Sequence, residues 1–174
     1  MTDPFGHHLK LDRIGEGERI DLVADQTECS AICKRLGLEA LDRLEAHAVL
    51  SRTGDTVRAT GRLAASVIQS CVVTSEPVAA HIDEPFELMF VREQPPAAAD
   101  QEIELDPNDC DVVFYDGGTI DLGGAIADTL ALSLDPYPRS ASAESALKEA
   151  GVLSEEQASP FAVLAALKGR MEED

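Results

Sequence analysis

Apolar and polar residues alternate over two long stretches in the first half of the chain, residues 41–52 and 56–69. In the second stretch, one set of alternate positions is apolar or small, and the other set holds Arg58, Thr60, Arg62 and Ser66. A period of two is that of a β-strand with one buried face, and the Thr53-Gly54-Asp55 turn between the stretches is typical of a hairpin. The pattern therefore predicts a long β-hairpin.

Shorter stretches on both sides of this hairpin also have strand patterns. Residues 8–14 and 19–23, separated by a Gly-Glu-Gly turn, predict a first hairpin, and residues 111–115 predict a short late strand. Residues 78–91 predict a longer strand, in which Pro85 indicates an edge or a bulge. The side chains of this strand that can face inward are Ile82, Phe86, Leu88 and Phe90. Together these stretches predict an antiparallel meander of five or six strands.

A helix is predicted between the first hairpin and the long one, over residues 26–36. Asp25 can cap it, Glu28 lies in its first turn, and Gly37 follows its last residue. A capping carboxylate satisfies the first N–H groups of a helix, and glycine adopts the left-handed conformation that ends one.

The stretch from Gly118 to Arg139 predicts a second helix, over residues 120–134, packed on the sheet. Thr119 can cap it, Asp121 lies in its first turn, and the residues on one side of it at four-residue spacing are Ile126, Leu130 and Leu134. Pro136 ends it, because the residue before a proline is pushed out of the helical region. Residues 135–139, Asp-Pro-Tyr-Pro-Arg, should therefore leave as an extended or turn segment with a defined shape.

The remaining segments set the domain boundaries. Residues 94–109 hold prolines, alanines and five acids, which predicts an acidic loop, and residues 140–158 are rich in Ser, Ala and Glu, which predicts a linker. A C-terminal helix is predicted over residues 159–170 from Ser159, Pro160 and Gly169. Its apolar stripe consists of Phe161, Leu164 and Leu167. The prediction is one α+β domain over residues 1–139, followed by the linker and the separate helix.

Charge changes the picture of what the protein can bind. The 174 residues carry a net charge of −19, of which residues 1–62 contribute −2 (nine Lys/Arg, eleven Asp/Glu) and residues 63–174 contribute −17 (five and twenty-two). Such a surface repels phosphate and attracts basic partners. Aromatic residues make up only 4%, so stacking platforms for bases are scarce.

The first residues lack an apolar signal sequence, and no run approaches the roughly 18 apolar residues of a membrane span. We therefore expect a cytoplasmic protein whose four cysteines are reduced.

None of the familiar catalytic or ligand-binding motifs is convincing. Cys29 and Cys33 have helical spacing, but Cys71 and Cys110 are isolated, whereas structural zinc takes two close pairs. The histidines are scattered, no G-x-S-x-G occurs, no glycine pair is followed by Lys-Ser or Lys-Thr, and residues 106–117 lack the glycine and glutamate of a calcium loop. We therefore predict no catalytic residues, no metal ligands and no cofactor.

Three features of the sequence resemble the YceD family, which is named for accumulation of 23S ribosomal RNA. They are the segment DLxxxIxxxLxLxLDPYPR at residues 121–139, the cysteine-containing strand unit before it and the SPFAVLAALK helix after it. The resemblance spans about residues 10–170. It implies a non-enzymatic factor that supports 23S rRNA accumulation and biogenesis of the large ribosomal subunit.

The chain departs from the family in its cysteines. Many members carry Cys-x-x-Cys after the long strand and a second cysteine pair beyond the proline segment, whereas here Cys71 is followed by Thr74 and residues 137–140 read Tyr-Pro-Arg-Ser. A metal role suspected for other members is therefore not carried over. The two prolines must hold the shape of the segment instead.

Two modes of action follow as hypotheses. In the first, the acidic part binds a basic ribosomal protein or the assembling large subunit, through Asp135, Tyr137 and Arg139 and through Phe161, Leu164 and Leu167. In the alternative, a local basic patch of Arg52, Arg58 and Arg62 binds rRNA directly. A metal-dependent nuclease at clustered carboxylates is a third, weaker hypothesis.

Overall fold

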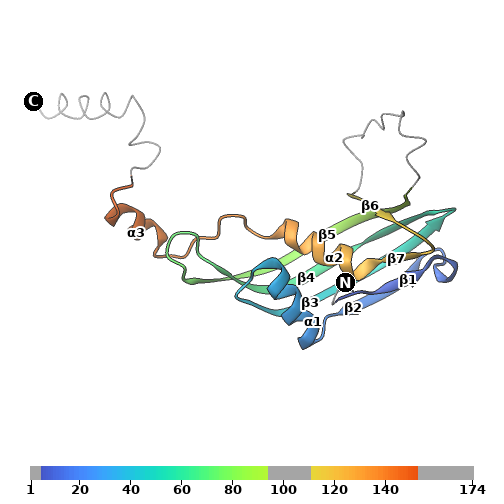
Figure 1. Cartoon of the computed structure of the whole chain (residues 1–174), viewed down its shortest axis with the longest axis horizontal. Coiled ribbons are helices and arrows are strands. Elements are labelled where there is room, and N and C mark those ends of the chain that lie inside the picture. The colour runs from blue at the N-terminus through green and yellow to red at the C-terminus, as the bar shows by residue number, and fades with distance from the viewer. Residues whose placement is uncertain (1–4, 94–110, 153–174) are drawn as a thin grey trace, which may run out of the picture. The chain divides into compact units, whose positions relative to one another are not determined.

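The computed structural model describes residues 5–93 and 111–152, which fall into two compact units. Unit 1 comprises Met1–Gln69 and Ala79–Pro136, and unit 2 comprises Ser70–Val78 and Tyr137–Asp174. Figure 1 shows the chain with its elements labelled. No helix of the described residues is long and apolar enough to cross a lipid bilayer.

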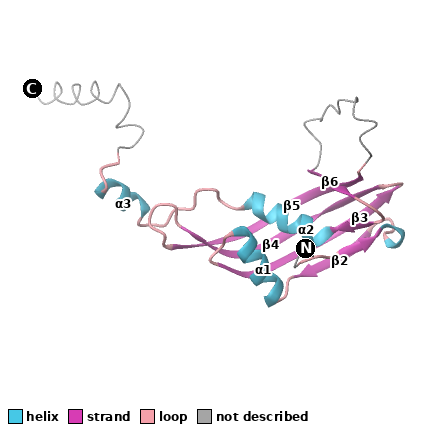
Figure 2. Cartoon of the chain, in the orientation of Figure 1, coloured by secondary structure: helices cyan, strands magenta, loops and turns pink. Residues whose placement is uncertain are grey.

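A five-stranded sheet forms most of unit 1, and it confirms the predicted α+β class (Figure 2). The strand order is β2-β3-β4-β5-β6; β3 runs antiparallel to β2 and β4, whereas β6 runs parallel to β5. The parallel pair departs from the predicted all-antiparallel meander. The strands are β2 (Glu18–Val23), β3 (Ala40–Thr53), β4 (Thr56–Ser70), β5 (Pro77–Arg92) and β6 (Asp111–Tyr115).

The long hairpin is confirmed, and its alternation separates the two faces of the sheet. On β3, Leu44, Ala46, Ala48 and Leu50 are at most 2% exposed, whereas His47 and Val49 between them are exposed. The buried set faces α1 (Gln26–Leu36) and α2 (Leu122–Ser133), which lie over this inner face (Figure 1). The opposite face, called the open face below, carries the polar set.

The first helix, α1, ends where its caps predicted. Asp25 Oδ1 accepts from Glu28 N and Glu28 Oε2 accepts from Asp25 N, both at 2.8 Å, so each residue satisfies an otherwise unpaired N–H of the other. Gly37 closes the helix in the left-handed conformation, with φ of 66°.

The predicted first hairpin is wrong. β1 (His8–Lys10) does not pair with β2 but with β7 (Thr119–Asp121), in a separate two-stranded sheet. A short 3₁₀ helix, η1 (Leu11–Arg13), turns the chain after β1, and Leu11 N donates to Gly118 O at 2.9 Å. A strand of three residues has too short a pattern to identify its partner. The sequence therefore does not predict the pairing of β1 with β7, which lies more than 100 residues further along the chain.

The second predicted helix is present, but its start differs. Thr119 lies in β7, and Asp121 is the capping residue of α2, accepting from Gly124 N at 3.0 Å. Ile126 and Leu130 are fully buried. A Cβ at Gly123 would lie 1.7 Å from Phe5 O, so only glycine lets the N-terminal segment approach the helix this closely.

The inward positions predicted for β5 are confirmed, since Ile82, Phe86, Leu88 and Phe90 are at most 8% exposed. β6 pairs with β5 only from Leu88 to Arg92, so Pro85 lies in the part of β5 that has no β6 beside it. This explains how a proline fits within a central strand.

Unit 2 contains α3 (Ala143–Glu149), within the stretch predicted as a linker. The predicted acidic loop, 94–109, and the predicted C-terminal helix, 159–170, lie outside the described residues. The proposed boundaries of 1–139, 140–158 and 159–170 stay predictions.

Candidate functional site

The segment that leaves α2 presents two side chains and buries one proline. Tyr137 is 71% exposed and Arg139 is exposed, whereas Pro138 between them is buried. Two backbone contacts hold the segment: in unit 1, Asp135 O accepts from Gln69 Nε2 at 2.9 Å, and in unit 2, Pro138 O accepts from Val72 N at 2.9 Å. The Asp135 end of the segment is therefore held within unit 1, and the Pro138 end is held within unit 2.

Next to it in unit 2, three backbone N–H groups converge on the sulfur of Cys71. Ser140 N lies 3.2 Å from Cys71 Sγ, Thr74 N 3.4 Å and Val73 N 3.5 Å. The side chain is buried at 2% exposure. A tight turn after Cys71, in which Ser75 N donates to Cys71 O at 2.9 Å, places the N–H groups of Val73 and Thr74 beside the sulfur.

Hydroxyl groups extend this contact into a network, which we call the Cys71 cluster: Cys71, Thr74, Glu76, Ser140 and Ser142. Thr74 Oγ1 lies 2.9 Å from Ser140 Oγ and donates to Glu76 Oε2 at 3.0 Å. Ser142 Oγ also donates to Glu76 Oε2 and lies 3.0 Å from Ser140 Oγ. The hydroxyls of Ser142, Ser140 and Thr74 lower the pKa of Glu76.

The same geometry determines the charge of Cys71. Burial acts to raise the pKa of the thiol, but hydrogen bonds from Ser140 and Thr74 outweigh it and lower the pKa to about 6. Donors that point at sulfur favour the thiolate over the thiol. At neutral pH these hydrogen bonds therefore favour the thiolate form of Cys71.

The residues present do not fit a cysteine-rich metal site of the kind suspected for the YceD family. Three of the positions gathered in the cluster, Cys71, Thr74 and Ser140, belong to the stretches compared with the family's cysteines, and only one is a thiol. Neutral hydroxyls are poor ligands for zinc. Within the described residues, no group of three His, Cys, Asp or Glu side chains is arranged to hold a metal ion.

The arginines of the alternative hypothesis are not brought together on one face. Arg58 and Arg62 lie on the open face of β4, where they form ion pairs with Glu87 and Asp83 of β5. The contact with Asp83 raises the pKa of Arg62 and lowers that of Asp83. Arg52 is the register partner of the buried Val57, so it belongs to the other set of alternate positions.

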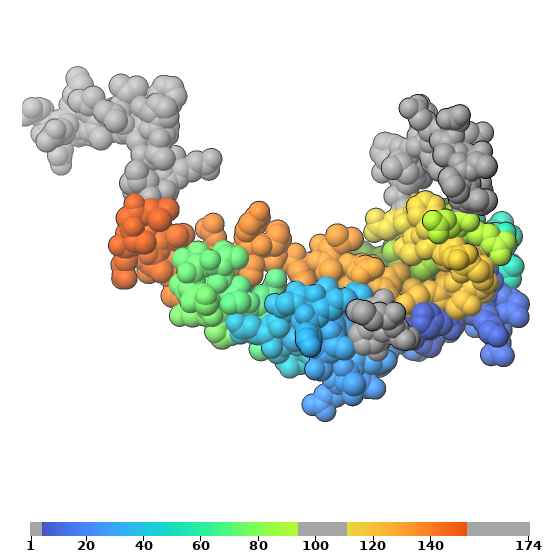
Figure 3. Space-filling model, viewed as in Figure 1, coloured from blue at the N-terminus to red at the C-terminus, as the bar shows by residue number. Residues whose placement is uncertain are grey.

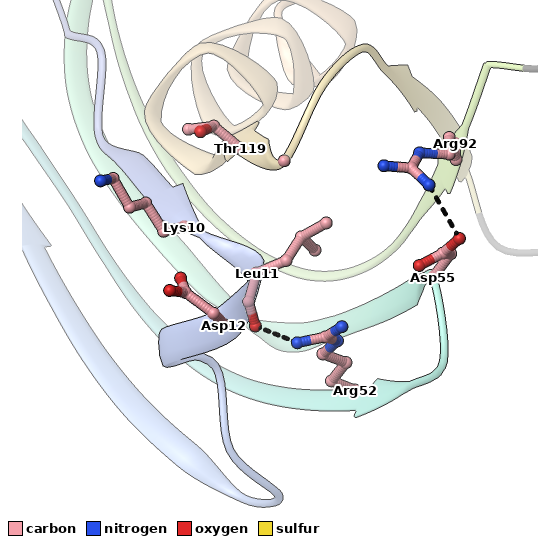
Figure 4. A pocket seen from close by; sticks show the side chains of 8 residues that line it. Lys10, Leu11, Asp12, Arg52, Asp55, Arg92 and Thr119 are labelled. Carbon is pink, nitrogen blue, oxygen red and sulfur yellow. Dashed lines mark hydrogen bonds and ion pairs between the residues drawn. The ribbon is translucent and has the colours of Figure 1, made fainter.

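Arg52 instead lines a cavity of about 420 Å³ with Lys10, Asp12, Asp55 and Arg92 (Figure 4). Its guanidinium donates to Leu11 O at 2.5 Å and to Gly54 O at 2.8 Å. Arg92 donates to Asp55 Oδ2 and Gly117 O, both at 3.1 Å. Both guanidinium groups thus donate hydrogen bonds to oxygen atoms of the protein itself, and these bonds stabilise the ends of β3 and β5.

Sequence reasoning placed Asp135, Tyr137 and Arg139 in the segment that follows α2, residues 135–139, which we call the exit segment. Phe161, Leu164 and Leu167 lie outside the described residues. The hydroxyl network of the Cys71 cluster was missed. Its signal in the sequence was the presence of hydroxyl residues, Thr74 and Ser140, in the two stretches that the resemblance to the YceD family singled out.

Comparison with protein families gives a match to the family described as large ribosomal RNA subunit accumulation protein YceD, over residues 59–168. The chain belongs to the YceD family. In this YceD family protein the matched region begins in β4 and includes β5, the Cys71 cluster, α2 and the exit segment, whereas β2 and α1 precede it. Comparison with the curated proteins and with the solved structures gives no match.

Proposed function

We propose that this YceD family protein supports the accumulation of 23S rRNA and the biogenesis of the large ribosomal subunit as a non-enzymatic factor. The family match over residues 59–168 carries this proposal. The mode of action that we propose is contact with a basic ribosomal protein or with the assembling large subunit.

The distribution of charge supports contact with protein over contact with RNA. Residues 63–174 carry −17, and this part contains nearly the whole region matched by the family. An acidic surface accelerates encounter with a basic protein and repels a phosphate backbone. The ion pairs of Arg58 and Arg62 with Glu87 and Asp83 point in the same direction, because an RNA phosphate would have to compete with a carboxylate at each.

Tyr137 and Arg139 are the best candidates for contact with this partner. Both are exposed, both are residue types that often dominate the binding energy of interfaces, and the buried Pro138 restrains the backbone between them. A restrained backbone reduces the entropy lost on binding. Phe161, Leu164 and Leu167 stay a second predicted contact.

The test uses the tagged full-length chain and the proteins extracted from purified large ribosomal subunits. After nuclease treatment, the wild type should retain a subset of these basic proteins at low salt, and retention should fall at moderate salt. The double variant Tyr137→Ser/Arg139→Ser should lose most of this recovery, because it leaves Pro136 and Pro138 in place and removes only the two side chains. Val23→Ser, at an apolar position that is 68% exposed in β2, is the matched control and should behave as the wild type.

Unchanged recovery by the double variant would refute the role of the exit segment. Recovery that disappears on nuclease treatment would instead favour rRNA contact. In that case, neutralising Arg58 and Arg62 should reduce the salt dependence of binding to 23S rRNA fragments.

A further inference from the structure

The last strand of the sheet, β6, exposes apolar side chains at an edge. Phe114 is 63% exposed and Val112 is 39% exposed, whereas Tyr115 is 6% exposed. β6 is at the end of the strand order, and Figure 3 shows residues 111–118 (yellow) at the surface. Exposed aromatic side chains on an edge strand are unusual, because natural sheets protect their edges with charge.

The exposed side chains extend a small apolar patch onto β5. The register pairs Val112 with Met89 and Phe114 with Val91, and partners in a register project from the same face. Met89 and Val91 are half-buried. These four side chains, which we call the β6 patch, lie side by side on the open face, opposite α1 and α2.

The backbone of the same residues points away from the sheet. Glu93 N donates to Tyr115 O at 2.9 Å, so the Tyr115 carbonyl faces β5. The N–H and C=O groups of one strand residue point to the same edge, and the direction alternates from residue to residue. The N–H and C=O groups of Val112 and Phe114 therefore point to the outer edge, with which no strand of the described residues pairs.

The charge around this edge indicates the kind of partner that fits. Asp111, the first residue of β6, Asp116, which follows β6, and Glu93, which follows β5, are all exposed. Residues 111–118 contain no lysine or arginine, and Arg92, the last residue of β5, forms an ion pair with Asp55. A strand added here would meet outward backbone groups, four apolar side chains and an acidic rim. Apolar residues at every second position with lysine or arginine between them satisfy all three features.

We propose that β6 is a docking edge for an extended basic segment of another protein, which pairs with Val112 and Phe114 and lays its apolar side chains on the β6 patch. The inference rests on the proposed function for the basic character of the partner, but it concerns a surface separate in sequence from Tyr137 and Arg139. It assigns strand addition as the mode of binding.

The test uses a peptide of alternating lysine and valine as the probe. Its binding to the full chain should slow amide hydrogen exchange at Val112 and Phe114 about tenfold or more, because new inter-strand hydrogen bonds protect these groups. A peptide of alternating glutamate and valine, and a peptide with the lysines and valines in separate blocks, should bind at least about tenfold more weakly.

Two variants separate the contributions of the side chain and the backbone. Phe114→Ser should weaken lysine–valine binding about tenfold, and Val112→Pro, which removes an outward N–H, should weaken it similarly. Val23→Ser, at the opposite edge strand, should have no effect, and thermal unfolding should show that Phe114→Ser is folded. Tyr137→Ser/Arg139→Ser should bind the peptide as the wild type does.

Three results would overturn the inference: equal binding of the glutamate–valine peptide, binding without protection of Val112 and Phe114, or a wild-type dimer that Phe114→Ser converts to a monomer. The last would make a second copy of the chain the occupant. If the peptide fails while ribosomal proteins are still recovered through Tyr137 and Arg139, this inference fails and the proposed function stands. If the peptide still binds while ribosomal proteins are not recovered, the proposed contact through Tyr137 and Arg139 fails and the docking edge stands.

Discussion

The thiol of Cys71 should be ionised at neutral pH, and the ionisation can be measured directly. Burial acts to raise its pKa, but hydrogen bonds from Ser140 and Thr74 outweigh burial and lower the pKa to about 6, from an ordinary value of 9.0. At pH 7 the thiol should then be about nine-tenths ionised, whereas a thiol with the ordinary value would be about one per cent ionised. The difference is large enough to follow by the ultraviolet absorbance of the thiolate.

The perturbation is Cys71→Ser, and the measurement is the difference between the titration curves of wild type and variant. The difference curve should show one step near pH 6. Cys29 supplies the control, because burial raises its pKa, and Cys29→Ser should leave the step near pH 6 unchanged. A step for Cys71 at the ordinary thiol value, or no step below it, would refute the reasoning that the hydrogen bonds from Ser140 and Thr74 outweigh burial.

Stability should follow the same linkage. Because the pKa of Cys71 is lowered in the folded chain, its ionisation stabilises the fold fully above the ordinary value of 9.0, and this contribution falls as the pH is lowered and is lost below about 6. The gap in thermal unfolding midpoint between wild type and Cys71→Ser should therefore narrow from pH 9 to pH 6. A gap that is constant over this range would contradict the linkage.

Three further predictions concern the fold and the open face. Gly61→Ala should lower the free energy of unfolding by about 2 kcal/mol or more, measured by denaturant titration, because the added Cβ would lie 2.0 Å from His47 O and 2.7 Å from Phe86 Cζ. Asp25→Ala should cost about 1 kcal/mol by the same measurement, because it removes the cap of α1; Asp25→Asn should recover most of the loss. The hydrogen bond from His47 Nδ1 to Asp21 Oδ1, 2.7 Å away, raises the pKa of His47, so NMR titration should place this pKa above the ordinary 6.5, and Asp21→Asn should return it toward that value.

Several elements were predictable because their signals are local. Asp25, Glu28 and Gly37 mark both ends of α1 within the helix and its two flanking residues, and the alternation of β3 and β4 separates their faces without reference to any partner. The start of α2 was misplaced by a few residues because both Thr119 and Asp121 can cap a helix. The pairing of Thr119 with Lys10 decides between them, since it places Thr119 in a strand.

The candidate site likewise has one part that local sequence signals predict and one part that they do not. The exposed, proline-restrained exit segment could be predicted, because prolines restrict the backbone wherever they occur. The Cys71 cluster could not, because Cys71 and Ser140 are 69 residues apart and neither side chain reveals that a backbone N–H will point at the sulfur. The acidic partners of Arg58 and Arg62 could not be predicted either, because they depend on which strand lies beside β4.

The sequence by itself determined the α+β class, the long hairpin, the two caps of α1, the abrupt end of α2 and the acidity of residues 63–174. These follow from periodicity, backbone preference and charge, which act within a few residues or by simple addition. Only the tertiary structure decided that β1 pairs with β7, that β6 runs parallel to β5 with Val112 and Phe114 facing outward, and that donors distant in sequence surround Cys71. Such contacts join segments far apart in the chain, and the free energy that selects them comes from burying one shared core.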